Sequence, residues 1–352
     1  MTPRSSAANR LSLQTARSAN RMATKAGLVF VIALIILCAL AIFHLGTGSR
    51  PLSASSVIEA LLHPDPKNFD HQIVRNLRAS RLIAAIAVGS ALGVTGALVQ
   101  SLIRNPLGEP QFLGLNAGAA FAVVTIFTLS FPLLSDPFSR PLVAACGGAA
   151  LFAMVLFASS IGRQGMTMLK VTLCGIALSA FASSLTSSIL ILDEDSLQAL
   201  RTWLAGDLAG ANMPLVLHAL PVLGAGMLIA IGSIPRLNAL AMGDTIAAGL
   251  GVKVRQTRIL GLVAAALLTG AAVSIAGPLG FVGLVVPHLA RQIGGSDMRV
   301  LIPLSILLGA SVVLCADIAA RSIIAPREIA TGIMTAFAGA PVFLFHVVRR
   351  LK

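Results

Sequence analysis

The residue types that usually perform chemistry are present in this chain, but they are not spaced for it. The four cysteines stand apart within apolar stretches, and the six histidines form neither a close pair nor a His-Glu-x-x-His motif. None of the five lysines lies in the Gly-Lys-Ser/Thr pattern of a nucleotide-binding phosphate loop. We interpret the cysteines as small packing residues; they are Cys38, Cys146, Cys174 and Cys315. The sequence predicts no metal centre, no catalytic cluster and no ATP site.

A stripe of serine hydroxyls has regular spacing inside an apolar stretch. Ser179, Ser183 and Ser187 recur at i, i+4 and i+8, so in a helix they share one face. Hydroxyls placed in this way either bond back to carbonyls of their own helix or line a polar pathway. The spacing leaves both interpretations open.

Another apolar stretch is interrupted by prolines and glycines. Residues 277–291 read Gly-Pro-Leu-Gly-Phe-Val-Gly-Leu-Val-Val-Pro-His-Leu-Ala-Arg. Pro278 and Pro287 lack a backbone donor, so we expect a helix to break or kink at each of them. In hydrocarbon a break is stable only where neighbouring protein or a water-filled cavity satisfies the freed carbonyls. The segment therefore indicates the working part of a polytopic membrane protein.

The composition places the chain among integral membrane proteins. Its 352 residues are 56% hydrophobic and 11% charged, with a mean hydropathy of +0.90, whereas a soluble domain is roughly 25% charged. Ten apolar runs are present, most of them close to the roughly 20 residues that a helix needs to cross a bilayer. They lie at about 28–45, 82–103, 112–132, 141–161, 171–192, 214–232, 259–276, 281–290, 301–320 and 332–348. We predict an all-α, polytopic membrane protein with about ten transmembrane helices, some of them broken.

The charge distribution predicts an orientation. With ten spans, seventeen of the 26 Lys and Arg residues fall on the side of the two termini, which predicts cytoplasmic termini. Only Glu109, Asp244 and Asp297 among the loop acids fall on that side, whereas the acids on the other side include Asp193, Glu194, Asp195 and Asp207. The net charge of +13 does not indicate a nucleic-acid partner, because the chain has no Tyr, one Trp and no basic face with interleaved aromatics.

We expect a basic, disordered cytoplasmic tail over residues 1–25 and a single transmembrane domain over 26–352, whose first helix is not removed as a signal peptide. Between the sixth and seventh spans, the segment 236–254 can form a short helix. Asp244 can cap its start, and Gly249 and Gly251 can end it. Such a helix is either a contact for a soluble partner or an amphipathic helix on the membrane surface.

Small residues predict close helix contacts and an internal symmetry. Gly89 and Gly93 have the small-xxx-small spacing that lets helix backbones touch, as do Gly114 and Gly118, and we expect them to pack within the chain. The segments 105–108 and 277–280 both contain Pro-Leu-Gly and follow Gly/Ala-rich helices of opposite predicted direction. This similarity between the two segments suggests an inverted internal repeat.

Several ordered motifs over about residues 50–350 resemble those of the FecCD-type permeases of ABC importers, which move ferric siderophores, haem or vitamin B12. Arg104-Asn-Pro-Leu-Gly-Glu-Pro-Gln-Phe-Leu-Gly-Leu-Asn-Ala-Gly118 resembles their RNPLA-x-P-x-x-LG-x-x-x-G signature. Met242-Gly-Asp-Thr-Ile-Ala-Ala-Gly-Leu-Gly251 resembles their coupling segment, and 277–291 resembles their GPxGFxGLxxPHxxR segment. The stretches 316–321 and 339–343 resemble the end of the same family.

This resemblance implies a transport subunit and not an enzyme. It implies a path at the interface of two permeases, identical or paralogous, in the bacterial inner membrane. A periplasmic binding protein would deliver the substrate, and a cytoplasmic ATPase dimer would use ATP and Mg²⁺, with no cofactor bound by this chain. Asn116 and the Trp203-Leu-Ala-Gly-Asp stretch favour a ferric siderophore, with haem or vitamin B12 as the alternative.

The resemblance also assigns roles to particular residues. Those that would contact the ATPase are Met242, Gly243, Asp244, Ala247, Gly249, Leu250 and Gly251. The arginines that would dock the binding protein are Arg78, Arg81 and Arg321. A gate maps onto Thr167 and Met168, and the pathway onto the stripe Ser179, Ser183 and Ser187.

Two departures and two rival classes accompany this assignment. Arg78-Ala-Ser-Arg81 lacks the family's proline, and Glu328-Ile-Ala-Thr-Gly332 replaces Glu-Ile-Pro-Val-Gly, which leaves the entry of the last helix open. An ion-coupled secondary transporter would need acids near the middle of the membrane, but only Asp317 lies within an apolar run. A membrane-embedded enzyme would need a convergent catalytic cluster, which the scattered His and Cys do not offer.

Overall fold

Every element that the structure describes is helical, as predicted. The computed structural model describes residues 27–48, 52–65, 67–106, 108–129, 139–161 and 167–351, without the side chains of residues 54, 168 and 345–351; the predicted tail over 1–25 lies outside this part of the chain. The first helix is Gly27–Gly46. The elements after it are α2 (Ala54–Leu62), α3 (Phe69–Gln72), the π-helix η1 (Ile73–Arg78), α4 (Ala79–Leu102), α5 (Leu115–Thr128), α6 (Arg140–Ser160), α7 (Met168–Leu192), α8 (Glu194–Leu204), α9 (Met213–Gly232), α10 (Ile234–Ala241), α11 (Asp244–Gly249), α12 (Val254–Ala276), α13 (Val282–Gly294), α14 (Met298–Ser322) and α15 (Thr331–Leu351).

Each of the ten apolar runs coincides with a helix. Among the described residues, seven helices are long and apolar enough to cross a membrane. The other three runs correspond to α5, α13 and α15, of which α5 has 14 residues and α13 has 13. At 1.5 Å per residue such a helix covers only about 20 Å of a hydrocarbon layer of about 30 Å. The chain segments that lead into α5 and α13 therefore enter the bundle without being helical.

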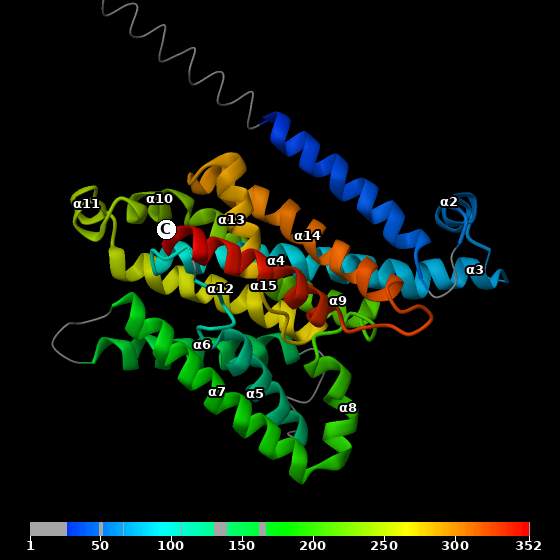
Figure 1. Ribbon diagram of the computed structural model, residues 1–352, viewed down its shortest axis with the longest axis horizontal. Coiled ribbons are helices and arrows are strands. Elements are labelled where there is room, and N and C mark those ends of the chain that lie inside the picture. Colours follow the sequence, from blue (N-terminus) through cyan, green and yellow to red (C-terminus); the bar gives the residue numbers. More distant parts are fainter. Residues whose placement is uncertain are drawn as a thin grey trace, which may run out of the picture.

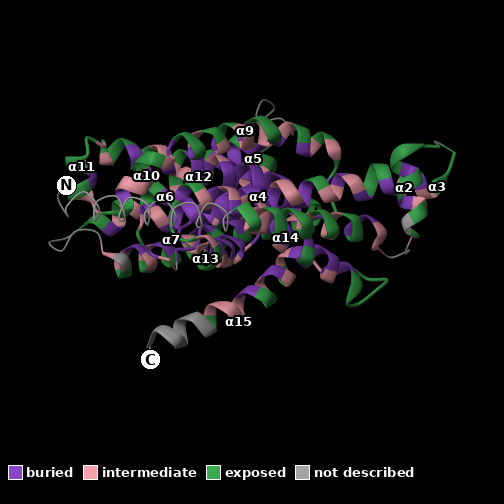
Figure 2. Ribbon diagram, turned by 90° about the horizontal axis from the view of Figure 1, so that it is seen from above, coloured by how far each residue is buried: buried purple, intermediate pink, exposed green. Residues whose placement is uncertain are grey.

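The core lies around α4. In the continuous helix Phe69–Leu102, which includes α4, 78% of the most apolar stretch is buried, against 17% in the first helix. Figure 1 shows α4 packed between α12 and α14, with α10 and α11 at one end of the bundle and α2 and α3 at the opposite end. Figure 2 shows that the buried residues concentrate in the interior of the bundle, in helices such as α4 and α12, while α15 leaves the main body. We call these ends of the bundle the α11 end and the α2 end.

Glycines let the core helices touch, and the predicted contacts within the chain are confirmed. A Cβ at Gly89 would overlap the backbone of α14, and a Cβ at Gly96 would overlap the carbonyl of Gly283 in α13. Gly118 of α5 meets Gly147 of α6 in the same way. Because backbone atoms lie on both sides of these contacts, no rotamer change can make room for a side chain.

The predicted break near residue 280 is present, and a neighbouring side chain compensates for the second proline. Residues 277–281 are not helical, and Phe281 has a left-handed φ of 66° before α13 begins. Pro287 stays inside α13, so of the break or kink expected there the helix shows no break. Its missing N–H leaves the carbonyl of Gly283 without the usual helical partner. The side-chain amide of Gln100 donates to that carbonyl at 3.2 Å.

A buried carboxylate joins several helices at the α2 end. Asp317 of α14 is fully buried and accepts two hydrogen bonds from Nε and Nη2 of Arg81, at 3.0 and 2.9 Å. Nε2 of His44 lies 2.8 Å from it, the hydroxyl of Thr331 donates to it at 2.8 Å, and Nε of Arg321 lies at 3.2 Å. The first helix, α4, α14 and α15 therefore meet at one side chain. Thr331, which belongs to the stretch Glu328-Ile-Ala-Thr-Gly332 that differs from the family pattern, is also the first residue of α15.

We expect Gly96→Ala to destabilise the protein, because its new methyl group would overlap the backbone of α13. Forced overpacking costs about 1–3 kcal/mol or more, so the midpoint of thermal unfolding in detergent should fall. Gly224→Ala in α9 is the matched control, because a Cβ there has open space and the helix gains propensity. Equal midpoints for the two variants would contradict the contact.

We expect Asp317→Asn to lower the same midpoint strongly. The change keeps the shape of the side chain but leaves Arg81 and Arg321 without their buried counter-charge, at a cost of about 3–5 kcal/mol. Asp195→Asn, at an exposed position in the first turn of α8, should change stability by about 0.5 kcal/mol or less. If both variants have the same thermal midpoint as the unchanged protein, the cluster around Asp317 does not hold the helix ends together.

Candidate functional site

A groove lined by the serine stripe lies between α5 and α7. It has a volume of about 520 Å³, and Ser179, Ser183 and Ser187 all line it. The amide side chains of Gln111 and Asn116 also line it, and none of its described lining residues is charged. We call this cavity the serine groove.

The hydroxyls of α7 divide between the two interpretations of the stripe. Those of Thr186 and Ser188 bond back to carbonyls one turn earlier, at 2.8 and 2.9 Å. The hydroxyl of Ser179 donates across the groove to the carbonyl of Gln111 at 3.4 Å. The stripe therefore faces an uncharged groove that combines hydroxyl and amide residues with apolar ones, which is a geometry that suits a pathway. The pathway role itself stays a prediction.

The two segments that contain Pro-Leu-Gly meet beside this groove. The carboxylate of Glu109 accepts a hydrogen bond from the backbone N–H of Phe281 at 3.1 Å, and the amide of Asn116 donates to the carbonyl of Leu279 at 2.9 Å. The rings of Phe112 and Phe281 pack edge to face, with centroids 6.5 Å apart. The two interrupted segments are thus direct neighbours; the inverted repeat stays a prediction.

Glu109 is a residue whose position the sequence did not reveal. The charge pattern assigns it to a loop on the side of the termini, whereas the structure buries it to 3% exposure. One of its oxygens accepts from the start of α13, and the other has no hydrogen-bond partner among the described residues. A carboxylate at a helix start is favourable because it accepts from N–H groups that the helix leaves unpaired.

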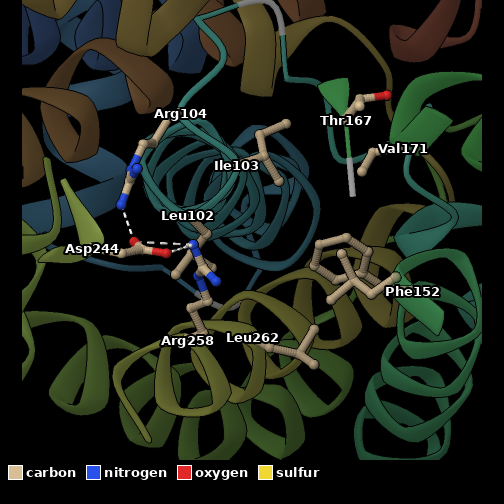
Figure 3. A pocket seen from close by; sticks show the side chains of 10 residues that line it. Leu102, Ile103, Arg104, Phe152, Thr167, Val171, Asp244, Arg258 and Leu262 are labelled. Carbon is tan, nitrogen blue, oxygen red and sulfur yellow. Dashed lines mark hydrogen bonds and ion pairs between the residues drawn. The ribbon is translucent and has the colours of Figure 1, made fainter. Parts of the chain in front are cut away.

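A second pocket, of about 400 Å³, lies beside α11 and brings two predicted sites together. We call it the α11 pocket; Asp244 and the predicted gate residue Thr167 both line it (Figure 3). The carboxylate of Asp244 pairs with Arg104 and with Arg258, in the latter case at 2.9 Å. The three side chains are 38 to 44% exposed. The side chain of Met168 lies outside the described part of the structure.

The prediction that Asp244 caps a helix is wrong. Asp244 is the first residue of α11, and Gly243, with φ of 117°, occupies the capping position without a side-chain bond. The carboxylate of Asp244 forms ion pairs with Arg104 and Arg258 instead of capping the helix. Gly251 is left-handed as predicted, with φ of 79°, whereas Gly249 is the last residue of the helix.

The predicted coupling segment contains two short helices, and one of them presents apolar side chains outward. Met242, Ile246 and Leu250 are exposed by 60, 49 and 63%, while Ala247 is fully buried. The preceding helix α10 is fastened to the bundle, because the amide of Asn238 bonds the carboxylate of Asp297 (2.7 Å) and the N–H of Met298 (2.9 Å) at the start of α14.

The Asp297 carboxylate also accepts from the backbone N–H of Arg299, and these hydrogen bonds hold the pKa of Asp297 below its usual range. The carboxylate therefore stays ionised and caps α14 at neutral pH.

The three arginines predicted to dock a binding protein are used inside this chain. Arg78 donates to the carbonyls of Leu45 (2.7 Å) and Gly46 (2.9 Å) at the end of the first helix, and Arg321 donates to Thr47 (2.8 Å). Arg81 pairs with Glu328 at 2.7 Å besides its bonds to the buried cluster. The Arg81 and Arg321 side chains are only 11 and 3% exposed. Their role in this structure is to fasten helix ends; docking stays a prediction.

No group of three or more His, Cys, Asp or Glu side chains that could hold a metal ion occurs in the described part of the chain. The arrangement offers a polar groove, a pocket beside α11 and an exposed apolar helix.

The FecCD transport family matches residues 33–349 of this chain. The Fe(3+) dicitrate transport system permease protein FecC of Escherichia coli (strain K12) is 38% identical over 320 residues, which cover 91% of this chain and 96% of FecC. The ferric enterobactin transport system permease protein FepD of the same strain is 39% identical over 308 residues, which cover 87% of this chain and 90% of FepD.

A solved structure of an ABC transporter assigned to the metal-chelate type, in an inward-facing conformation, has the same fold. Its TM-score is 0.76 at 29% sequence identity, and the match covers 91% of this chain and 99% of the other. The family match includes both interrupted segments, the serine groove and α11. This chain is therefore a multi-pass membrane protein that belongs to the FecCD transport family of ABC transporter permeases.

Proposed function

We propose that this chain is the transmembrane subunit of an ABC importer and forms part of the translocation path for a ferric siderophore. A periplasmic binding protein delivers the chelate, a second permease completes the path, and a cytoplasmic ATPase dimer supplies the energy from ATP and Mg²⁺. The names of the relatives FecC and FepD, which carry ferric dicitrate and ferric enterobactin, support this substrate class. The observation that carries the proposal is the serine groove, an uncharged surface groove of the apolar bundle that hydroxyl groups of α7 help to line.

The chemistry of the groove suits the passage of a chelate. Hydroxyls such as those of Ser183 and Ser187 can bond weakly to many oxygen-rich ligands, whereas fixed charges would hold an ion tightly. Weak binding along a path favours release. Specificity then belongs to the soluble binding protein.

The position of α11 supports contact with a soluble ATPase over attachment to the membrane surface. Figure 1 places α11 at the tip of the bundle, beyond the ends of α10 and α12. Three exposed apolar side chains, Met242, Ile246 and Leu250, lie in α11 or directly beside it in the chain. We infer that the α11 end is cytoplasmic and the α2 end periplasmic, in agreement with the excess of basic residues on the side of the termini.

The rival class of ion-coupled transporters finds little support in the buried acids. Asp317 is surrounded by two arginines, a histidine and a threonine, which leaves it no room to bind and release a coupling ion. Glu109 bonds the backbone at the start of α13.

A strain that lacks this gene should lose uptake of a labelled ferric siderophore under iron limitation. The wild-type gene should restore uptake, and Asp244→Lys should not, because a lysine would repel Arg104 and Arg258 and displace α11. If iron uptake is unchanged and haem or vitamin B12 uptake is lost, the substrate class is wrong. If uptake of all three is unchanged, the transport proposal fails.

We expect Ser183→Phe to reduce uptake by filling the serine groove while the protein still inserts and folds. Ser188→Phe is the matched control, because Ser188 lies on the same helix outside the groove lining. Uptake of the labelled chelate, normalised to the amount of protein in the membrane, measures both. Equal uptake by the two variants would place the path elsewhere.

A further inference from the structure

The motif that begins at Arg104 contacts α11 through Arg104 and lines the serine groove through Gln111 and Phe112. We propose that residues 104–106 and 108–114, which we call the link segment, connect α11 mechanically to the serine groove, and that Arg104 is the positioning residue at its start. This inference rests on the proposed transport function. It names the route by which movement of α11 reaches the path.

The first contact of this route is the ion pair between Arg104 and Asp244. Arg104 directly follows the end of α4 and has a left-handed φ of 51°, which directs the chain away from the helix axis. Figure 3 shows Arg104 and Arg258 reaching the carboxylate from two different elements. Arg258 belongs to α12, which packs in the core. Asp244 therefore ties α11 both to the core and to the link segment.

The last contacts of the route lie in the groove wall. The side chains of Gln111 and Phe112 line the serine groove, and the carbonyl of Gln111 accepts the Ser179 hydroxyl at 3.4 Å. Gly175 of α7 lies so close to the carbonyl of Phe112 that no Cβ fits between them. A shift of the link segment therefore displaces the wall and the serine stripe together.

The link segment is built to move as one piece. Pro106 and Pro110 restrict its backbone. Successive backbone hydrogen bonds close its turns, including Gly108 N–H to Asn105 (3.0 Å) and Leu113 N–H to Glu109 (3.2 Å). These restraints limit bending in the described parts of the segment between Arg104 and Gln111.

The test uses the complete transporter in proteoliposomes, with the four native cysteines changed to serine and Ser183→Cys as a reporter in the groove. The rate of labelling by N-ethylmaleimide is measured with and without ATP, Mg²⁺ and vanadate. In the parent we expect the two rates to differ. In Arg104→Gln this difference should shrink by about two- to five-fold, the range that a half-exposed ion pair supports. Arg104→Lys, which keeps the charge, should retain most of it.

Arg255→Gln is the control, because Arg255 is an exposed arginine one turn before Arg258 on α12. It should leave the labelling difference unchanged, and the thermal midpoint of Arg104→Gln should equal that of the parent. The proposed role of the link segment would be wrong if Arg104→Gln kept the ATP-dependent labelling difference of the parent, or if Arg255→Gln lost as much of it. Either result would leave the proposed transport function intact. A parent without any ATP-dependent change would reject the transport proposal and this inference together.

Discussion

In hydrocarbon, a backbone group that its own helix leaves unpaired must find a partner within the protein, and the centre of this bundle is arranged around that constraint. The carbonyl of Gly283, left unpaired by Pro287, accepts from Gln100 of α4. The start of α13 donates to Glu109, and the carbonyl of Leu279 accepts from Asn116. Three elements therefore converge on one interrupted helix. The interruption therefore dictates which polar side chains must be buried beside it.

The same constraint explains the glycines of the core. A side-chain amide on α4 can reach a carbonyl of α13 only if the two helix backbones approach closely, and Gly96 against Gly283 permits that approach. Gly277, with φ of 72°, lies against the carbonyl of Trp203 in a contact that leaves no space for a Cβ. Close packing of small residues in turn replaces the large apolar side chains that would stabilise a soluble core. The hydrogen bonds to the unpaired carbonyls of α13 therefore depend on the close backbone contacts that the glycines permit.

Local patterns of the sequence predicted much of this fold, whereas contacts between distant segments were not predictable from it. Hydropathy alone located the ten helices, and helical spacing placed Ser179, Ser183 and Ser187 on one face, because both depend only on neighbouring residues. The pairing of Arg81 with Asp317 joins residues 236 positions apart, so no local rule could identify it. The cap predicted for Asp244 failed because two arginines from other elements compete for the carboxylate. A signal was present in retrospect, since Arg81 directly precedes one apolar run and Asp317 is an acid within another, and opposite charges next to hydrocarbon favour pairing.

The two charged clusters differ in a way that bears on transport. Asp317 is buried at the α2 end with several partners, and breaking such a cluster is costly because charges are left unpaired in a medium of low polarity. Asp244 at the α11 end is 44% exposed, and exposed pairs can separate and reform at small cost because water solvates the released charges. The bundle is therefore fastened at one end and adjustable at the other. A machine driven by a partner at α11 needs this asymmetry, because a small applied energy can then rearrange the groove wall without loosening the helices that contain it.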